Sequence, residues 1–193
     1  MDEIIKDIEG NEYRTIKIGS QTWMAENLRV KTFSDGSPIT LVQDSLQWQN
    51  SHFPCQTLFE NQNQNIAYGR LYNWFAVNAM ENICPAGWKI PSVEDWNLLS
   101  QNFGGLAAAS EMLQHRTGFN AQLYGFRAGG FEGFGNSVFY WTSDTIPGQP
   151  ELPAPGKTSE AVQLKINDPS IRVSSEYRIE GFYIRCLKIT NQY

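Results

Sequence analysis

Two histidines, His52 and His115, are the obvious candidates for acid–base or zinc chemistry in this 193-residue sequence. A serine hydrolase would need one of them beside an activated serine, yet the sequence has no Gly-x-Ser-x-Gly elbow. Zinc would need several nitrogen or sulfur ligands close together, whereas the histidines are far apart and the cysteines are not clustered. His52 falls in a polar stretch and His115 near the end of an expected helix, where a solvated histidine is ordinary. We therefore expect neither catalysis at these residues nor a zinc site.

The three cysteines, Cys55, Cys84 and Cys186, allow one disulfide and leave one thiol over. All three are equally compatible with buried thiols in a reduced protein, because a free cysteine behaves as a small apolar side chain. The count alone does not decide whether the protein folds in an oxidising compartment.

Charge and apolar content limit the function classes. The formal net charge is −5 and the 15 Lys and Arg residues are scattered singly, so we expect no nucleic-acid groove. No run approaches the ~18 apolar residues of a membrane helix. The first ten residues carry five charged side chains and are not a signal peptide as written. A single domain over residues 1–193 is the default for this length.

The stretch from Cys84 to Leu99 predicts a tight turn, a short strand and a capped helix. Gly87 permits the positive φ that a turn requires. Ser92 is an N-cap candidate whose hydroxyl can accept from the amide of Asp95, and acidic residues favour the helix start. The positions expected to face the core are Trp88, Ile90, Trp96, Leu99 and Phe103.

Periodicity and turn residues predict the other elements. Strands are expected within 8–28, as a pair joined at Gly19-Ser20, and at 138–143, 161–166, 171–174 and 181–189. Helices are expected over 68–80 and 106–116. The polar, turn-rich sequence over 31–65 predicts irregular surface chain. Aromatic residues spaced by glycines occupy 117–143. A proline-rich loop is expected over 146–156.

Four stretches together resemble one known family. They are Asp7 to Leu28, ending in IGSQTWMAENL; YGRLYNW at 68–74; CPAGWKIPS at 84–92 with Trp96; and GFNA at 118–121, leading through GFR at 125–127 to YWTS at 140–143 and GFYIRC at 181–186. Their combination resembles the Fibrobacter succinogenes major paralogous domain over about residues 7–188.

The resemblance implies an α+β, C-type lectin-like fold with a small twisted antiparallel sheet, two helices and long irregular loops. The family is grouped with C-type lectin-like and formylglycine-generating-enzyme-like domains. Its members are typically exported, often lipid-anchored proteins of Bacteroidetes and relatives, which implies an extracytoplasmic, cell-surface or secreted location. The resemblance further implies a Cys84–Cys186 disulfide, because both cysteines lie where the family places its pair. Cys55 lies outside the family's motifs and is expected to be free.

Two alternative functions follow from this grouping. A formylglycine-generating enzyme needs a reactive cysteine pair near the chain end, and only Cys186 lies there, so we expect no catalysis. Calcium-dependent lectins use Glu-Pro-Asn or Gln-Pro-Asp and then Trp-Asn-Asp. Here Gln149-Pro150-Glu151 precedes Ile166-Asn167-Asp168, but the tryptophan is missing and Glu151 departs from the pattern. We expect no bound metal or cofactor; Glu151, Asn167 and Asp168 are the candidates if calcium binds.

The leading hypothesis is a non-catalytic, monomeric, exported recognition module for a glycan or protein ligand. A purely structural role in an envelope assembly is a further alternative. Because irregular loops on a rigid core carry most binding, the expected ligand surface is the region 144–156 with its neighbours. The candidate ligand-binding residues are Glu132, Trp141, Asp144, Gln149, Glu151, Asn167 and Asp168.

Overall fold

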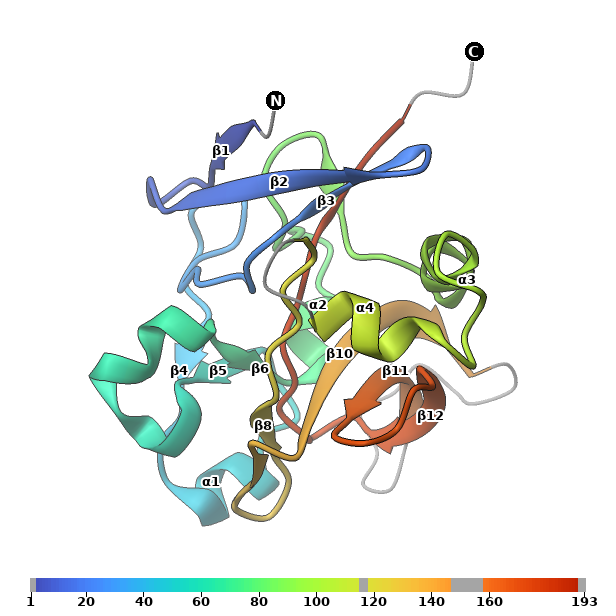
Figure 1. The fold of residues 1–193 in the computed structure, drawn as a ribbon. Coiled ribbons are helices and arrows are strands. Elements are labelled where there is room, and N and C mark those ends of the chain that lie inside the picture. Colours follow the sequence, from blue (N-terminus) through green and yellow to red (C-terminus); the bar gives the residue numbers. More distant parts are fainter. Residues whose placement is uncertain (1–2, 115–117, 147–157, 191–193) are drawn as a thin grey trace.

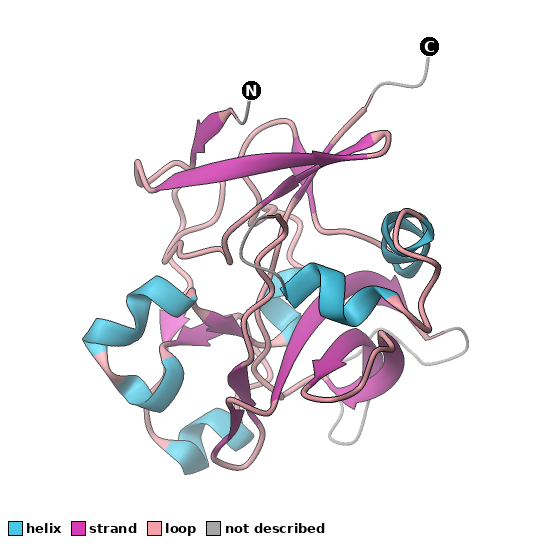
Figure 2. Cartoon of the chain, in the orientation of Figure 1, coloured by secondary structure: helices cyan, strands magenta, loops and turns pink. Residues whose placement is uncertain are grey.

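The structure, a computed structural model, describes residues 3–114, 118–146 and 158–190, which form a mixed α+β fold of short elements. The strands are β1 (Ile4–Lys6), β2 (Glu12–Ile18), β3 (Gln21–Met24), β4 (Thr40–Leu41), β5 (Cys55–Thr57), β6 (Leu71–Tyr72), β7 (Trp88–Lys89), β8 (Tyr124–Arg127), β9 (Phe131–Phe134), β10 (Ser137–Thr145), β11 (Thr158–Lys165), β12 (Arg172–Tyr177) and β13 (Leu187–Lys188). The helices are α1 (Ser45–Gln49), α2 (Trp74–Val77), α3 (Val93–Gln101) and α4 (Ala109–Gln114), with two 3₁₀ helices, η1 (Phe59–Asn61) and η2 (Asn63–Tyr68). Long loops and turns join these elements (Figure 2).

The described strands form three sheets (Figure 1). Their strand orders are β1-β2-β3-β13-β7, β12-β11-β10-β8-β9 and β4-β5-β6. Most pairs are antiparallel, whereas β10 with β8 and β4 with β5 are parallel. The α+β class is confirmed. The expectation of one small antiparallel sheet with two helices is too simple, because the described residues build three sheets, two parallel pairs and four α-helices.

The capped helix after Pro91 is confirmed as α3. Ser92 Oγ accepts from the Asp95 amide at 3.1 Å, and Asp95 Oδ2 accepts from the Ser92 amide at 2.8 Å, so each satisfies a donor that the helix start leaves free. Trp96 and Leu99 are fully buried, as their spacing predicts. The structure also confirms the β2–β3 pair and the strands expected within 138–177. It confirms the second helix as α4, which is shorter than expected.

The expected helix over 68–80 is wrong. Leu71 and Tyr72 form β6, and only Trp74–Val77 are helical. The Tyr72 amide donates to Phe182 O at 2.9 Å, which fixes an extended backbone there. Asn73 Oδ1 then accepts from the Ala76 amide at 3.2 Å and starts a short helix. Pairing with a distant segment overrides the local helical periodicity.

The expected irregular surface chain over 31–65 is also wrong, because much of it is ordered around one arginine. It carries β4, α1, β5, η1 and part of η2, and it buries Trp48 and Cys55. The Arg127 guanidinium donates to Val42 O at 2.9 Å and to Gln43 O at 3.0 Å. The guanidinium also lies 4.4 Å from the centre of the Trp48 ring. These contacts tie the segment to β8.

The segment from Gly181 to Lys188 joins the sheets. Gly181 bridges to Arg127, Phe182 to Tyr72 and Tyr183 to Tyr140, and Leu187 in β13 pairs with both Trp23 and Lys89. Figure 1 shows this segment, in red, running from beside β12 to the sheet that holds the amino-terminal strands. The expected strand over 181–189 is therefore mainly a series of single bridges.

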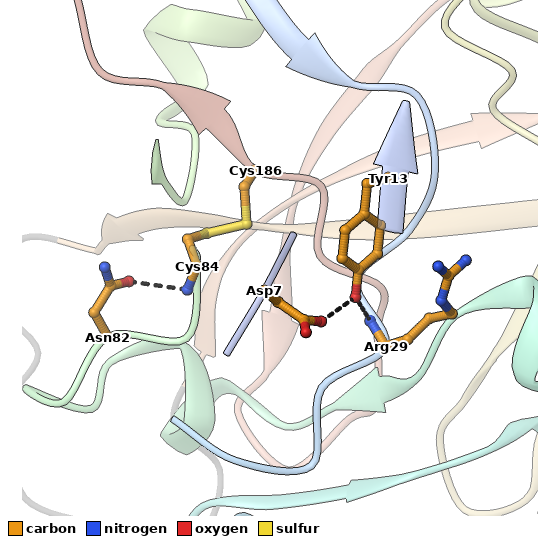
Figure 3. Close-up of a disulfide and its surroundings, with 6 residues drawn as sticks. All are labelled: Asp7, Tyr13, Arg29, Asn82, Cys84 and Cys186. Atoms are coloured by element: carbon orange, nitrogen blue, oxygen red, sulfur yellow. Dashed lines mark hydrogen bonds between the residues drawn. A yellow bond between two sulfur atoms is a disulfide. The ribbon is translucent and has the colours of Figure 1, made fainter. Parts of the chain in front are cut away.

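The Cys84–Cys186 disulfide is confirmed, with the two Cα atoms 6.0 Å apart, and Cys55 is free and buried (Figure 3). A structural disulfide indicates an oxidising, extracytoplasmic compartment. Close to the bridge, the Tyr13 hydroxyl donates to Asp7 Oδ2 at 2.7 Å and accepts from the Arg29 amide at 2.9 Å. Burial, followed by the bond to Asp7, raises the pKa of Tyr13, so the phenol stays protonated.

None of the described helices has the length and apolar content that spanning a bilayer requires.

Replacing both bridged cysteines (Cys84→Ser with Cys186→Ser) is expected to lower the free energy of unfolding by about 4 kcal/mol, because the bridge restrains a long loop of the unfolded chain. The two cysteines are 102 residues apart in the sequence. Urea unfolding of the oxidised proteins measures the difference. As a control, Cys55→Ala should retain the wild type's sensitivity to a reducing agent, and the double variant should have none. Equal urea midpoints for wild type and double variant would contradict the structural role of the bridge.

Candidate functional site

The described sequence-predicted ligand residues, Glu132, Trp141, Asp144, Asn167 and Asp168, do not form one site, and several have internal partners. Trp141 is fully buried, and its indole N–H donates to Tyr72 O at 2.8 Å. A side chain without exposed surface cannot contact a ligand, so its assignment as a binding residue is corrected: it is a core residue. Trp141 lies in the part of β10, residues 137–142, in which every residue is buried.

Asp144 serves helix α3. Its Oδ2 accepts from the Val93 amide, the first of the helix, at 2.7 Å. A carboxylate at a helix start satisfies a free donor and interacts favourably with the helix dipole. This hydrogen bond joins β10 to α3. In the described structure the role of Asp144 is therefore to stabilise the start of the helix.

Asn167 and Asp168 lie in the turn after β11. Asn167 has a φ of 57°, which asparagine tolerates in turns. Asp168 Oδ1 accepts from the Ser170 amide at 2.9 Å and also from the Ser170 hydroxyl, while Asp168 Oδ2 lies 2.7 Å from Arg172 Nη2. The Ser170 bonds, and after them Arg172, lower the pKa of Asp168 to about 2. A calcium ion at Asp168 would have to replace these partners.

Gln149 and Glu151 lie outside the described residues, as does His115. Across the part of the chain that the structure describes, no three His, Cys, Asp or Glu side chains are arranged to hold a metal ion.

Glu132 belongs to an acidic cluster made of Glu132, Glu176 and Glu180. Glu132 is exposed on β9, and Glu176 lies on β12 opposite Ser159. Glu180 Oε2 is buried and has no hydrogen-bond partner among the described residues. Burial raises the pKa of Glu180 to about 8, with the negative charge of Glu176 as the next cause. Near neutral pH the Glu180 carboxyl group is therefore protonated.

A second surface feature is an aromatic face built from η1, η2, β8 and β9. Its members are Phe59, Tyr68, Tyr124, Phe131 and Phe134. The rings of Tyr68 and Tyr124 are stacked, with their centres 4.2 Å apart and their planes 16° apart. The Phe134 ring lies 5.5 Å from that of the buried Phe59, and the Phe134 side chain is 57% exposed. One exposed ring and three partly exposed rings, packed on the buried Phe59, make a rigid apolar surface.

Two glycines and the strand register position this face. Tyr124 and Phe134 are directly opposite each other in the β8–β9 pair. Gly125 has a φ of 75°, and a Cβ there would lie 2.6 Å from Phe59 Cε2. Gly133 has a φ of 73°, and its Cβ would lie 2.8 Å from Phe126 Cε1. Both positions need glycine because the backbone is left-handed and the neighbouring rings approach it closely.

A depression of about 300 Å³ opens beside the aromatic face, and we call it the amide depression. The described residues that line it are all uncharged: Gln114, Ala121, Gln122, Leu123, Tyr124, Phe134 and Gly135. Gln122 Nε2 donates to Gln114 O at 3.2 Å and to Asn120 Oδ1 at 2.9 Å, and Gln114 Nε2 donates to Ser110 Oγ at 2.9 Å. These bonds use the amide nitrogens, and no donor among the described residues is bonded to either amide oxygen.

A second depression, of about 400 Å³, shares Gln114 with the first. Its other lining residues are Glu111, Ile166, Asn167, Asp168 and Pro169. Two of the sequence-predicted residues, Asn167 and Asp168, therefore lie in the depression next to the aromatic face.

The sequence analysis did not identify Tyr68, Tyr124 or the two glutamines as site residues. The sequence feature that indicated the face is the set of phenylalanines spaced by glycines over 117–143, because glycine allows aromatic rings to pack closely against the backbone. Tyr68 was assigned to an expected helix, and only the fold brings it against β8.

Cys55, Cys186 and His52 are the remaining described residues with reactive side chains that the sequence analysis considered. Burial raises the pKa of Cys55 to about 12, so its thiol remains protonated, and Cys186 is bridged to Cys84. His52 packs edge-on against Phe75 with ring centres 5.9 Å apart, and its Nδ1 is buried without a partner in the described structure.

The acidic cluster predicts a pH dependence of stability. The native protein binds a proton at Glu180 more tightly than the unfolded chain does, since the pKa rises from the ordinary 4.5 to about 8. This stabilising contribution is complete below about pH 4.5 and is lost as the pH rises through about 8. Thermal melts between pH 5 and 9 should therefore show a falling melting temperature, and Glu180→Gln should flatten that fall.

Glu132→Gln is the matched control, because it removes an exposed carboxylate that contributes less to the shift. An unchanged pH slope in Glu180→Gln would show that Glu180 titrates normally.

Comparison with known proteins places the chain in a family. No curated protein and no solved structure shows significant similarity to the chain. The family model described as the Fibrobacter succinogenes major domain matches residues 16–188, which include β3, α3, the bridged cysteines and the whole aromatic face. The match covers nearly the whole sequence, and the chain belongs to the Fibrobacter succinogenes major domain family.

Proposed function

We propose that this protein is a non-catalytic recognition module that binds its ligand on the aromatic face. The exposed Phe134 ring, held on buried Phe59 beside the stacked Tyr68 and Tyr124, is the observation that carries the proposal. A folded chain pays a free-energy cost for keeping such a ring in water, and exposed apolar surface of this kind marks interaction sites. The adjoining depressions supply polar groups that would orient a ligand.

The chemistry of the cysteines and acids supports binding rather than catalysis. A formylglycine-generating activity would need a free cysteine pair, whereas Cys186 is bridged to Cys84 and Cys55 is a buried, protonated thiol. Asp144 and Asp168 are engaged by backbone amides or by Arg172. Calcium-dependent sugar binding has no supporting contact in the described residues, so we do not favour it.

The proposal includes an exported location and a divergent C-type lectin-like scaffold. The disulfide supports export, since such bridges persist in oxidising compartments. The α+β class and the long connections between short strands support the scaffold assignment. The module would act as a monomer on a cell surface or after secretion.

A direct test measures binding of the labelled protein to printed panels of polysaccharides, cell-wall fragments and peptides. The wild type should bind at least one class, and Phe134→Ala should weaken that binding about tenfold, because truncating an exposed aromatic anchor removes its contact area. The matched control is Phe53→Ala, which removes another exposed ring, 41% exposed, from a different loop. Equal binding by wild type and Phe134→Ala would show that the ligand does not use the aromatic face.

A further inference from the structure

We propose that the ligand of the aromatic face is a neutral oligosaccharide, bound without calcium across the two depressions that share Gln114. This inference rests on the proposed function and adds the ligand class. One sugar ring would lie against Tyr124 and Phe134, and its hydroxyl groups would donate to the side-chain oxygens of Gln114 and Gln122.

The composition of the amide depression matches the surface of a sugar ring. A pyranose presents an apolar face of C–H groups and a rim of hydroxyl groups. The apolar face fits an aromatic ring, as Tyr124 and Phe134 provide, and the hydroxyl groups need hydrogen-bond partners at the side. Amide side chains suit this role because the amide oxygen accepts two hydrogen bonds without carrying charge.

The two glutamines are held before any ligand arrives. Gln122 is fixed through its Nε2 bonds to Gln114 O and Asn120 Oδ1, and Gln114 through its bond to Ser110 Oγ. Since the nitrogens make these bonds and no described donor is bonded to the oxygens, the oxygens would accept from a ligand hydroxyl. A side chain that is already ordered loses less entropy on binding, which favours affinity.

The charges favour a neutral ligand. None of the described residues that line the amide depression is charged, and the described lining of the neighbouring depression adds Glu111 and Asp168. The whole chain has a formal net charge of −5. A sugar chain with carboxylate or sulfate groups would meet a negative field and lose affinity, most strongly at low salt. Peptide ligands with acidic residues are disfavoured for the same reason.

The shared lining residue favours a chain of sugars over a single one. Gln114 lines both depressions, and Asn136, next to Gly135, accepts from the Ile166 amide at 2.8 Å. The two depressions are therefore neighbours on one surface. A linear ligand that crosses Gln114 would contact the rings in one depression and the turn at Asn167 in the other.

Isothermal titration of the full chain tests the inference with linear hexasaccharides of glucose, xylose and mannose, and with hexagalacturonate as the anionic probe. At least one neutral hexasaccharide should bind, with equal affinity in EDTA and in calcium, and more tightly than hexagalacturonate. Phe134→Ala and Gln114→Ala should each weaken that binding about tenfold, whereas Phe53→Ala should not change it. Thermal melts establish that each variant is folded.

Three results would overturn the inference. If no neutral hexasaccharide binds while another class from the printed panels binds through Phe134, the ligand class is wrong and the proposed function stands. If a neutral hexasaccharide binds equally to wild type and Phe134→Ala, both the ligand site and the proposed function fail. If affinity disappears in EDTA, binding depends on calcium, and the amide depression is not sufficient.

Discussion

The backbone of the segment from Gly181 to Lys188 pairs with strands of all three described sheets and so holds them together. It bridges to β6, β8 and β10 and then pairs with β3 and β7, so it crosses from one five-stranded sheet to the other. Arg185, within it, is fully buried and donates to Asn27 Oδ1 at 2.6 Å and to Phe119 O. Burial lowers the pKa of Arg185, and its amide and carbonyl partners offset the cost of burying the charge. The adjacent Cys186 fixes the segment to Cys84 covalently.

The same segment places the aromatic face. Tyr183 is a buried residue of this segment, and its hydroxyl donates to Tyr124 O at 3.2 Å. Gly181 pairs with Arg127 at the end of β8. A Cβ at Gly181 would lie 2.8 Å from Trp48 Cζ2, so this backbone also packs closely on the segment that carries α1. The Gly181–Lys188 segment therefore supports the strand that carries Tyr124. A surface held in this way loses little conformational freedom when a ligand binds.

Local signals in the sequence predicted part of this structure and could not predict the rest. Ser92 and Asp95 specify α3 within four residues, so the helix start was predictable, and the family resemblance supplied the cysteine pairing. The helix expected over 68–80 failed because Tyr72 pairs with Phe182, which is 110 positions away in the printed sequence. Long-range pairing of this kind leaves no local pattern. The aromatic face was missed for the same reason, since Tyr68 reaches Tyr124 only after β8 and η2 are packed.

We propose that recognition occurs at the aromatic face and the amide depression. The most direct measurement is an NMR titration of isotope-labelled protein with the neutral hexasaccharide that binds best. The predicted result is a set of shifts confined to the ring signals of Tyr124 and Phe134 and to the side-chain amides of Gln114 and Gln122. Shifts centred instead on the acidic cluster at Glu132, Glu176 and Glu180, with the ring signals unchanged, would contradict the claim.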